Sequence, residues 1–416
     1  MHRDSFPQPK SRQLAPASSA KFFGLADAIA KHYEPTETQM GTLERSYQAV
    51  GQYVIDSEEF SELALRAHAQ GSRAIGTLIR PLWSDVFDID LVIRLHRSAL
   101  QRYGGSNGPV RLINDLHTVL KRYADAHGLG IQKWDRCVTL KYADEMCVDV
   151  APIIDEPSII ALFGETHAKI PDRDLKQYEP SNPEGLASSF NKAAKISPVF
   201  TITKAIHSFA MDSARGELQP LPDANEVMGR LLSRLIQLMK IHRDKTFGAP
   251  TLGQDFAPKS IFVTTLAAAA YEARAQIAHE SPLDLLLDVV ETMTLFFERH
   301  QLGGDREYWS LPNLTAPGDN LASGMNSAAN QQAFVQWHAR LVSDLTKLLQ
   351  CIERRAGTDE LIKLVTEIFG DRAARAVVEM DAPRPLDKPG QRLVKLGTVA
   401  AATISVPARA HTFFGK

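Results

Sequence analysis

Residues 86–93 constrain the fold more than any other stretch, because polar and apolar side chains alternate along Val-Phe-Asp-Ile-Asp-Leu-Val-Ile. Such alternation is typical of a β-strand with one buried face. Successive side chains of a strand point to opposite faces, so Asp88 and Asp90 project from the same side. The run therefore predicts a sheet strand that presents two carboxylates together, where one metal ion could bridge them.

The elements around this strand mix helix and sheet. Apolar residues recur at helical spacing between residues 21 and 70, which predicts a helical lead-in. Two β-rich runs at 135–142 and 146–154 indicate a hairpin. Beyond a link at 171–183 the pattern is mostly helical as far as residue 368. We therefore predict an α+β chain whose first half contains a mixed sheet with helices and whose second half is helical.

The length of the chain favours two lobes. At 416 residues it exceeds the size at which a single hydrophobic core stops growing. With 44% apolar and 23% charged residues, its composition is that of an ordinary globular protein. We predict a flexible N-terminal arm at 1–20, a core with lead-in helices at 21–185, a helical lobe at 186–380, and a Pro-rich link with a tail at 381–416.

Composition also excludes several classes of protein. Lys plus Arg (47) nearly balance Asp plus Glu (49), so no global field attracts a polyanion and no long nucleic acid is expected as a partner. Three cysteines without CxxC spacing argue against a disulfide framework and against a zinc site. The sequence shows neither an apolar signal core nor an apolar run of membrane-spanning length. We expect a cytoplasmic protein without a membrane partner.

A third carboxylate completes a metal-binding pattern. Asp149 lies in an apolar run, where an unpaired charge is costly, so a metal ion is a reason for its presence. Hard divalent cations take oxygen ligands, and two of them about 4 Å apart stabilise the attacking and leaving oxygens of phosphoryl chemistry. We predict Asp88, Asp90 and Asp149 as catalytic ligands of two Mg²⁺ ions, with Mn²⁺ as an alternative. Taken alone, an Asp-x-Asp pair such as Asp88 and Asp90 is more typical of the solvated edge of a half-exposed strand, and the neighbouring motifs shift the weight to metal binding.

A glycine turn precedes the strand. Gly71 and Ser72 offer free backbone N–H groups and a hydroxyl, which can cradle the phosphates that metal ions hold. The turn reads Gly-x-x-x-x-Gly through Gly76, but Thr77 follows where a Walker A loop has Lys. The turn therefore predicts phosphate binding without a P-loop.

These motifs together resemble the DNA-polymerase-β-like nucleotidyltransferase superfamily. Within it they are most similar to the bacterial branch related to cyclic GMP-AMP synthase and oligoadenylate synthase, the CD-NTases of CBASS anti-phage defence. The matching motifs stand in family order between about residues 47 and 369, and comprise Gln70-Gly71-Ser72, Asp88-Ile89-Asp90-Leu91, Val148-Asp149-Val150-Ala151-Pro152, Ser181-Asn182-Pro183, Lys240 and Pro258-Lys259-Ser260. The resemblance implies a polymerase-β-like core with a C-terminal helical lobe like that of oligoadenylate synthase.

The resemblance also implies roles for single residues. Ser72 would contact triphosphate oxygens, Lys240 would reach the phosphates from the helical lobe, and Ser260 would bind ribose or phosphate. Gln70 is a candidate base contact beside Gly71 in the nucleotide-binding turn. Taken singly, Lys240 could be a solvated helix charge, Ser260 a helix N-cap and Gln70 a surface residue.

The implied activity is the synthesis of a cyclic oligonucleotide second messenger from ATP and other NTPs, with release of pyrophosphate, in anti-phage signalling through a downstream effector. A C-terminal His-Thr-Phe-Phe-Gly sequence at 411–415 favours a cyclic trinucleotide, with a cyclic dinucleotide as the alternative. An activating HORMA-like, peptide-binding regulatory protein is a further implied partner. Two other interpretations stay open: nucleotidyl transfer to a protein or RNA acceptor, and a non-catalytic regulatory binding module.

Overall fold

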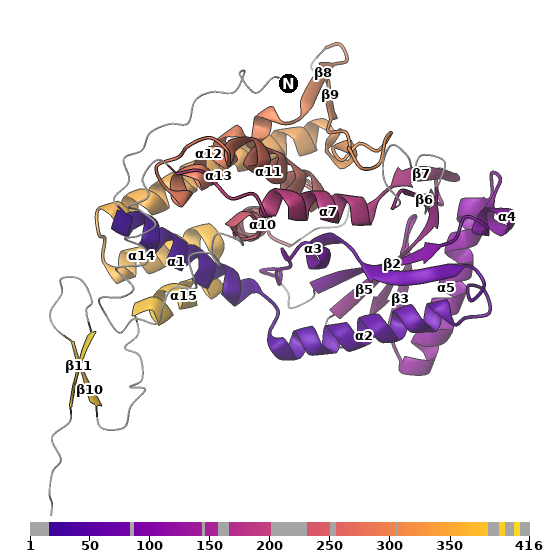
Figure 1. The fold of residues 1–416 in the computed structure, drawn as a ribbon, viewed down its shortest axis with the longest axis horizontal. Coiled ribbons are helices and arrows are strands. Elements are labelled where there is room, and N and C mark those ends of the chain that lie inside the picture. Colours follow the sequence, from indigo (N-terminus) through magenta and orange to yellow (C-terminus); the bar gives the residue numbers. More distant parts are fainter. Residues whose placement is uncertain are drawn as a thin grey trace, which may run out of the picture.

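The computed structural model describes residues 16–83, 87–143, 146–156, 166–200, 231–249, 255–304, 306–381, 391–395 and 403–407. Most of the arm predicted at 1–20 and the tail sequence at 411–415 lie outside these residues. Figure 1 shows two parts side by side, a sheet with its helices and a lobe built of helices. Among the described helices, none combines the length and the apolar composition that a bilayer crossing requires.

The first part is built on one mixed sheet. Its described strands follow the order β1-β2-β5-β4-β3, and β6 pairs with both β5 and β7. β2 and β5 run parallel, whereas their other neighbours run antiparallel to them. The strands are β1 (Ala64–Ala69), β2 (Phe87–Leu95), β3 (Gly130–Lys133), β4 (Val138–Lys141), β5 (Met146–Asp155), β6 (Ala168–Asp172) and β7 (Gln177–Ser181).

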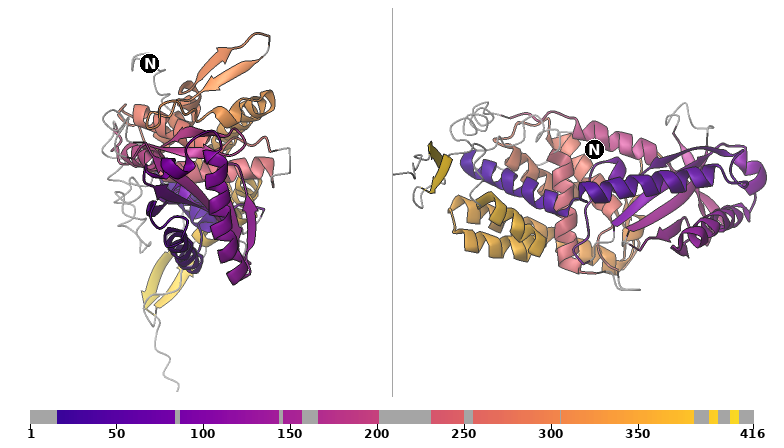
Figure 2. Two further views of the ribbon diagram at one scale, coloured as in Figure 1. Left: turned by 90° about the vertical axis from the view of Figure 1, so that its right-hand side faces the viewer. Right: turned by 90° about the horizontal axis from the view of Figure 1, so that it is seen from below.

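Two helices cover one face of this sheet, α2 (Glu37–Ile55) and α5 (Gly108–His127). Every second residue of β2, from Ile89 to Leu95, packs with apolar side chains of both helices in one buried cluster. Val148 and Val150 of β5 belong to the same cluster. Seen from below, α2 lies in front of the strands (Figure 2). The alternation of the sequence thus leaves the intervening residues of β2 and β5 on the opposite face, which we call the carboxylate face.

The second part is a helical lobe with its own core. It contains α1 (Pro16–Tyr33), α10 (Leu231–Phe247), α11 (Ser260–Arg274), α12 (Pro282–Thr292), α13 (Ala328–Glu353), α14 (Thr358–Phe369) and α15 (Asp371–Asp381). Aromatic rings of Phe262, Trp309 and Phe334 pack against one another at its centre. α1 packs against α10, α13 and α15, so consecutive helices α1 and α2 serve different parts of the molecule (Figure 1).

Several shorter helices and two hairpins pack beside the two parts or extend from them. α3 (Gly71–Ala74), α4 (Ala99–Tyr103) and α7 (Pro183–Ala194) accompany the sheet, and α7 also packs against α11 of the lobe. The lobe carries η3 (Met293–Leu295), η4 (Ser323–Met325) and a hairpin of β8 (Glu298–Gln301) with β9 (Glu307–Ser310). Near the C-terminus, β10 (Gln391–Lys395) pairs with β11 (Thr403–Pro407).

The structure confirms the α+β class, with a mixed sheet and its helices beside a helical lobe, but it corrects three local predictions. Residues 64–69 form edge strand β1 instead of helix, because pairing with β2 outweighs the helical spacing of small residues there. The link expected at 171–183 contains parts of the β6–β7 hairpin. Helix α1 begins at Pro16, inside the predicted arm. The remaining segment boundaries stay predictions.

Candidate active site

The three predicted aspartates lie together on the carboxylate face. In the parallel register of β2 and β5, Asp90 stands opposite Asp149, and Asp88 stands opposite Cys147. Asp88 is exposed near the start of β2, whereas Asp90 and Asp149 are half-buried. Parallel pairing of β2 with β5 therefore brings together carboxylates that are about 60 residues apart in the sequence.

The surroundings of these carboxylates oppose their ionisation. Desolvation by the protein raises the pKa of Asp90 to about 6, and the charges of Asp149 and Asp88 add to this effect. Desolvation and the charge of Asp149 likewise raise the pKa of Asp88, although a hydrogen bond with the Cys147 thiol acts in the opposite direction. Desolvation also raises the pKa of Asp149, against a hydrogen bond from Thr139. Like charges held this close favour a bound cation.

The glycine turn packs directly against this cluster. The backbone N–H of Gln70 donates to the carbonyl of Asp90 at 3.0 Å. Gly71 follows with φ +59°, and a β-carbon added there would lie 2.1 Å from Asp90 Oδ2. Ser72, half-buried in α3, accepts a backbone hydrogen bond from Thr77 at 2.9 Å. The structure thus places Gln70 and Gly71 next to Asp90. Nucleotide binding by Gln70, Gly71 and Ser72 stays a prediction.

Lys240 reaches the same region from the helical lobe. Its side chain is buried, and Nζ donates to the carbonyl and the hydroxyl of Thr77 at 3.1 Å each. Burial lowers the pKa of Lys240 to about 7, and the nearby charge of Arg243 contributes in the same direction. The positive charge of Lys240 partly offsets the rise in the pKa of Asp90. The alternative interpretation of Lys240 as a solvated helix charge is therefore wrong.

Ser260 lies at the start of α11, beside Arg243 of α10. It is the first residue of α11, and Lys259, not Ser260, occupies the N-cap position. The Ser260 hydroxyl accepts a hydrogen bond from the Arg243 guanidinium, three residues after Lys240 on α10. The structure therefore places Ser260 beside Arg243, and among the described residues it shows no direct contact of Ser260 with the aspartates. The role of Ser260 in nucleotide binding stays a prediction.

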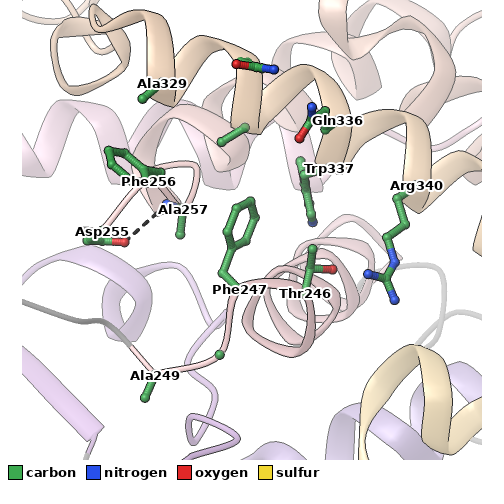
Figure 3. Close-up of a pocket in the computed structure, with 13 residues that line it drawn as sticks. Thr246, Phe247, Ala249, Asp255, Phe256, Ala257, Ala329, Gln336, Trp337 and Arg340 are labelled. Atoms are coloured by element: carbon green, nitrogen blue, oxygen red, sulfur yellow. Dashed lines mark hydrogen bonds between the residues drawn. The ribbon is translucent and has the colours of Figure 1, made fainter.

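A separate cavity of about 520 Å³ opens beyond the end of α10 (Figure 3). Phe247, Phe256 and Trp337 line it, together with Gln336 and Arg340 of α13. The indole Nε1 of Trp337 is buried and has no hydrogen-bond partner among the described residues. None of the predicted site residues belongs to its lining. The cavity has the size and mixed character of small-molecule pockets, but it is not the aspartate site.

The donor set of the aspartate site fits a hard divalent cation. Asp88, Asp90 and Asp149 supply carboxylate oxygens, which such ions prefer, and their raised pKa values indicate that desolvation outweighs the neighbouring hydrogen-bond donors and the charge of Lys240. Within the described residues, no group of three His, Cys, Asp or Glu side chains is arranged to hold a metal ion unaided. Mg²⁺ commonly completes its shell with water and substrate phosphates. The metal assignment stays a prediction.

Sequence patterns alone missed two threonines of the site. Thr77 departs from a Walker A loop and follows Gly76 in the family pattern, but neither feature predicts that it is buried and binds Lys240. Thr139 lies opposite Asp149 in the β4–β5 ladder and donates a hydrogen bond to Asp149 Oδ1. The hairpin predicted around 135–154 is the sequence feature that could have identified Thr139, because the pairing of β4 with β5 determines which residue stands opposite Asp149. That register could not be read from the sequence.

Comparison with known proteins agrees with this geometry. A family model described as "Second Messenger Oligonucleotide or Dinucleotide Synthetase domain" matches residues 26–193, a range that includes the three aspartates and the glycine turn. A c-di-GMP synthase of Roseivirga ehrenbergii is 25% identical over 403 residues, which cover 94% of this chain and 97% of that protein.

Solved structures share the fold. The CD-NTase CdnG of Bradyrhizobium diazoefficiens, in complex with GTP, superposes with a TM-score of 0.59 at 17% identity and covers 86% of this chain and 99% of its own. CdnC of E. coli MS115-1, in a complex with HORMA-deltaN, gives a TM-score of 0.53 at 13% identity, over 84% of this chain and 96% of its own.

Proposed function

We propose that this chain is a nucleotidyltransferase of the bacterial CD-NTase family and that it makes a cyclic oligonucleotide from nucleoside triphosphates. One observation carries this proposal: Asp88, Asp90 and Asp149 share one face of neighbouring parallel strands, and Gly71 of the glycine turn packs against Asp90. This arrangement suits a triphosphate held beside metal-binding carboxylates.

The proposed reaction is nucleotidyl transfer between two nucleotides. A ribose hydroxyl of the acceptor attacks the α-phosphorus of the donor, the bond to the β-phosphate oxygen breaks, and pyrophosphate leaves. Asp149 orients or deprotonates the attacking hydroxyl, while the turn at Gly71 and Ser72 holds the donor triphosphate. Bound Mg²⁺ or Mn²⁺ would supply charge neutralisation at the phosphates. A second or third transfer then closes the ring.

We favour a cyclic dinucleotide that contains guanosine. The c-di-GMP synthase of Roseivirga ehrenbergii matches nearly the whole chain, and CdnG, which shares the fold, was solved with GTP. The trinucleotide expected from the sequence depends on residues 411–415, which lie outside the described residues. A trinucleotide therefore stays the alternative product.

Mass spectrometry of the products tests this proposal. The purified protein is incubated with GTP alone, ATP alone or all four NTPs, with Mg²⁺ or Mn²⁺, and then treated with phosphatase. Asp88→Asn is the inactive control, and Asp125→Asn, an exposed carboxylate on α5 paired with Lys121, is the matched active control. A phosphatase-resistant cyclic product that is absent with Asp88→Asn would support the proposal, and its mass gives the ring size.

Failure to form a free product would favour the two alternatives. Radioactive label from α-³²P NTPs that appears on protein or RNA in the same reactions would indicate transfer to a macromolecule. Absence of both products and label, with and without a HORMA-like partner, would favour a non-catalytic binding module. We also propose that such a partner activates the chain and that its product acts on a downstream effector in anti-phage signalling. Phage plating on cells that express the complete system, with wild type or Asp88→Asn, tests this role.

A further inference from the structure

Asp149 is held on one side by its neighbour in the sheet. Thr139 of β4 stands directly opposite Asp149 of β5, and the Thr139 hydroxyl lies within hydrogen-bond distance of Asp149 Oδ1. Thr139 is buried, with 6% of its surface exposed. Among the described residues, no group donates to the second carboxylate oxygen, Oδ2. The two oxygens of this carboxylate therefore differ in their surroundings.

A tryptophan determines the direction of this hydrogen bond. The indole Nε1 of Trp134 lies 2.8 Å from Thr139 Oγ1. An indole N–H can only donate, whereas a threonine hydroxyl has one proton and two lone pairs. Because Thr139 accepts from Trp134, its single proton is free to point at Asp149. The chain of hydrogen bonds therefore runs from Trp134 through Thr139 to Asp149.

The hairpin between β3 and β4 fixes the tryptophan in place. Trp134 follows the last residue of β3, and its backbone N–H donates to the carbonyl of Cys137 at 2.9 Å. The side chain is 48% exposed and belongs to none of the buried apolar clusters. Its ring therefore contributes little to the core, which leaves the hydrogen bond to Thr139 as its specific contact.

We propose that Thr139 and Trp134 are positioning residues for Asp149. The Thr139 hydroxyl occupies Asp149 Oδ1, and the Trp134 indole directs that hydroxyl, so that Oδ2 stays available for the metal ion and the acceptor hydroxyl. Outer partners of this kind orient metal-binding side chains in proteins generally. This inference rests on the proposed nucleotidyltransferase function, and it adds two residues to the machinery that the aspartates form.

Three substitutions separate positioning from packing. Thr139→Val keeps the shape of the side chain but removes the hydroxyl, Thr139→Ser keeps the hydroxyl, and Trp134→Phe keeps a ring without the N–H. We expect Thr139→Val to lower kcat about 10- to 100-fold with little change in KM, Thr139→Ser to retain most activity, and Trp134→Phe to lose less than Thr139→Val. The double variant Trp134→Phe/Thr139→Val should be no worse than Thr139→Val alone.

A binding measurement keeps this test independent of turnover. Titration with Mn²⁺ alone, followed by the loss of its free-ion EPR signal, gives the metal affinity of each variant even if the wild type proves inactive. We expect about 10-fold weaker Mn²⁺ binding in Thr139→Val and recovery in Thr139→Ser. Wild-type Mn²⁺ affinity in Thr139→Val, equal defects in Thr139→Ser and Thr139→Val, or additive losses in the double variant would overturn the proposal. A wild type that binds Mn²⁺ but forms no product would refute only the proposed function.

Discussion

Gly71 approaches the carboxylate of Asp90 so closely that an added β-carbon would lie 2.1 Å from Asp90 Oδ2. With φ at +59°, Gly71 also has a backbone conformation that other residues rarely adopt. We expect Gly71→Ala to displace the Asp90 carboxylate and to lower turnover by about 100-fold or more, because small misplacements of catalytic groups have such effects. Steady-state pyrophosphate release measures the loss.

Gly128→Ala is the matched control for this substitution. Gly128, which caps the end of α5 outside the site, has a similar φ of +66°, and no heavy atom lies within 4 Å of an added β-carbon. Both variants should lose about 1 kcal/mol of stability from the left-handed backbone. Only Gly71→Ala should lose activity. Equal losses of turnover in the two variants would mean that backbone strain alone, and not the approach to Asp90, explains the requirement for glycine.

Metal binding should stabilise the folded protein. The charge of Asp149 raises the pKa of Asp88, and the charges of Asp149 and Asp88 raise the pKa of Asp90. A divalent cation that binds these carboxylates only in the folded state should therefore increase the free energy of unfolding. We expect Mn²⁺ and Mg²⁺ to raise the unfolding temperature of the wild type relative to EDTA, and Asp90→Asn to remove most of this shift and all product formation. Scanning fluorimetry and product analysis check both. An Asp90→Asn variant with normal turnover would refute the metal assignment.

The raised pKa of Asp90 also predicts a pH dependence of stability. Its value in the folded protein is about 6, whereas an unfolded aspartate titrates near about 4. Between these pH values the folded state binds more protons, so this group makes the metal-free protein less stable as pH rises from about 4 to about 6. The unfolding temperature of wild type minus that of Asp90→Asn, measured in EDTA, should fall across this window. A flat difference would contradict the prediction.

Lys240 should produce the opposite slope at higher pH. Burial lowers its folded pKa to about 7, whereas an unfolded lysine titrates near about 10.4. Between these values the unfolded state binds more protons, so this group favours folding increasingly as pH rises from about 7 to about 10. Comparison of unfolding temperatures of wild type and Lys240→Met over this range isolates the contribution. Parallel profiles for the two proteins would show that Lys240 keeps an ordinary pKa.

Local patterns predicted those parts of the site that depend on a single strand. Alternation alone placed Asp88 and Asp90 on one face, and the structure places Asp149 beside them through the pairing of β2 with β5. The sequence could not reveal that Lys240 is buried against Thr77. The helical spacing of apolar residues in α10 does not show which residues from the sheet part pack against that helix. It missed β1 because small residues fit a helical period as well as an edge strand.

The last prediction concerns the connection between the sheet and α7. Glu184, in the first turn of α7, accepts hydrogen bonds from Arg66 of β1 at 2.6 Å and from Arg94 of β2 at 3.0 Å. The Arg94 side chain is 4% exposed and also pairs with Asp155 at 2.7 Å. Because Arg94 lies on the same strand face as Asp90, this ion-pair cluster links α7 to the strand that carries the site.

Glu184→Ala would remove the charged acceptor that Arg66 and the buried Arg94 share, while Arg94 keeps Asp155 and the Thr166 carbonyl. We therefore expect a loss of about 1.5–3 kcal/mol in the free energy of unfolding, the usual range for hydrogen bonds to charged groups. Glu184→Gln keeps two acceptor lone pairs and should lose less. Asp125→Ala, which breaks the exposed pair with Lys121, is the control and should cost at most about 0.5 kcal/mol. Urea denaturation followed by circular dichroism measures all three. If Glu184→Ala unfolds at the same urea concentration as Asp125→Ala, the cluster does not stabilise the junction, and the apolar contacts of α7 with α11 must hold the two parts together.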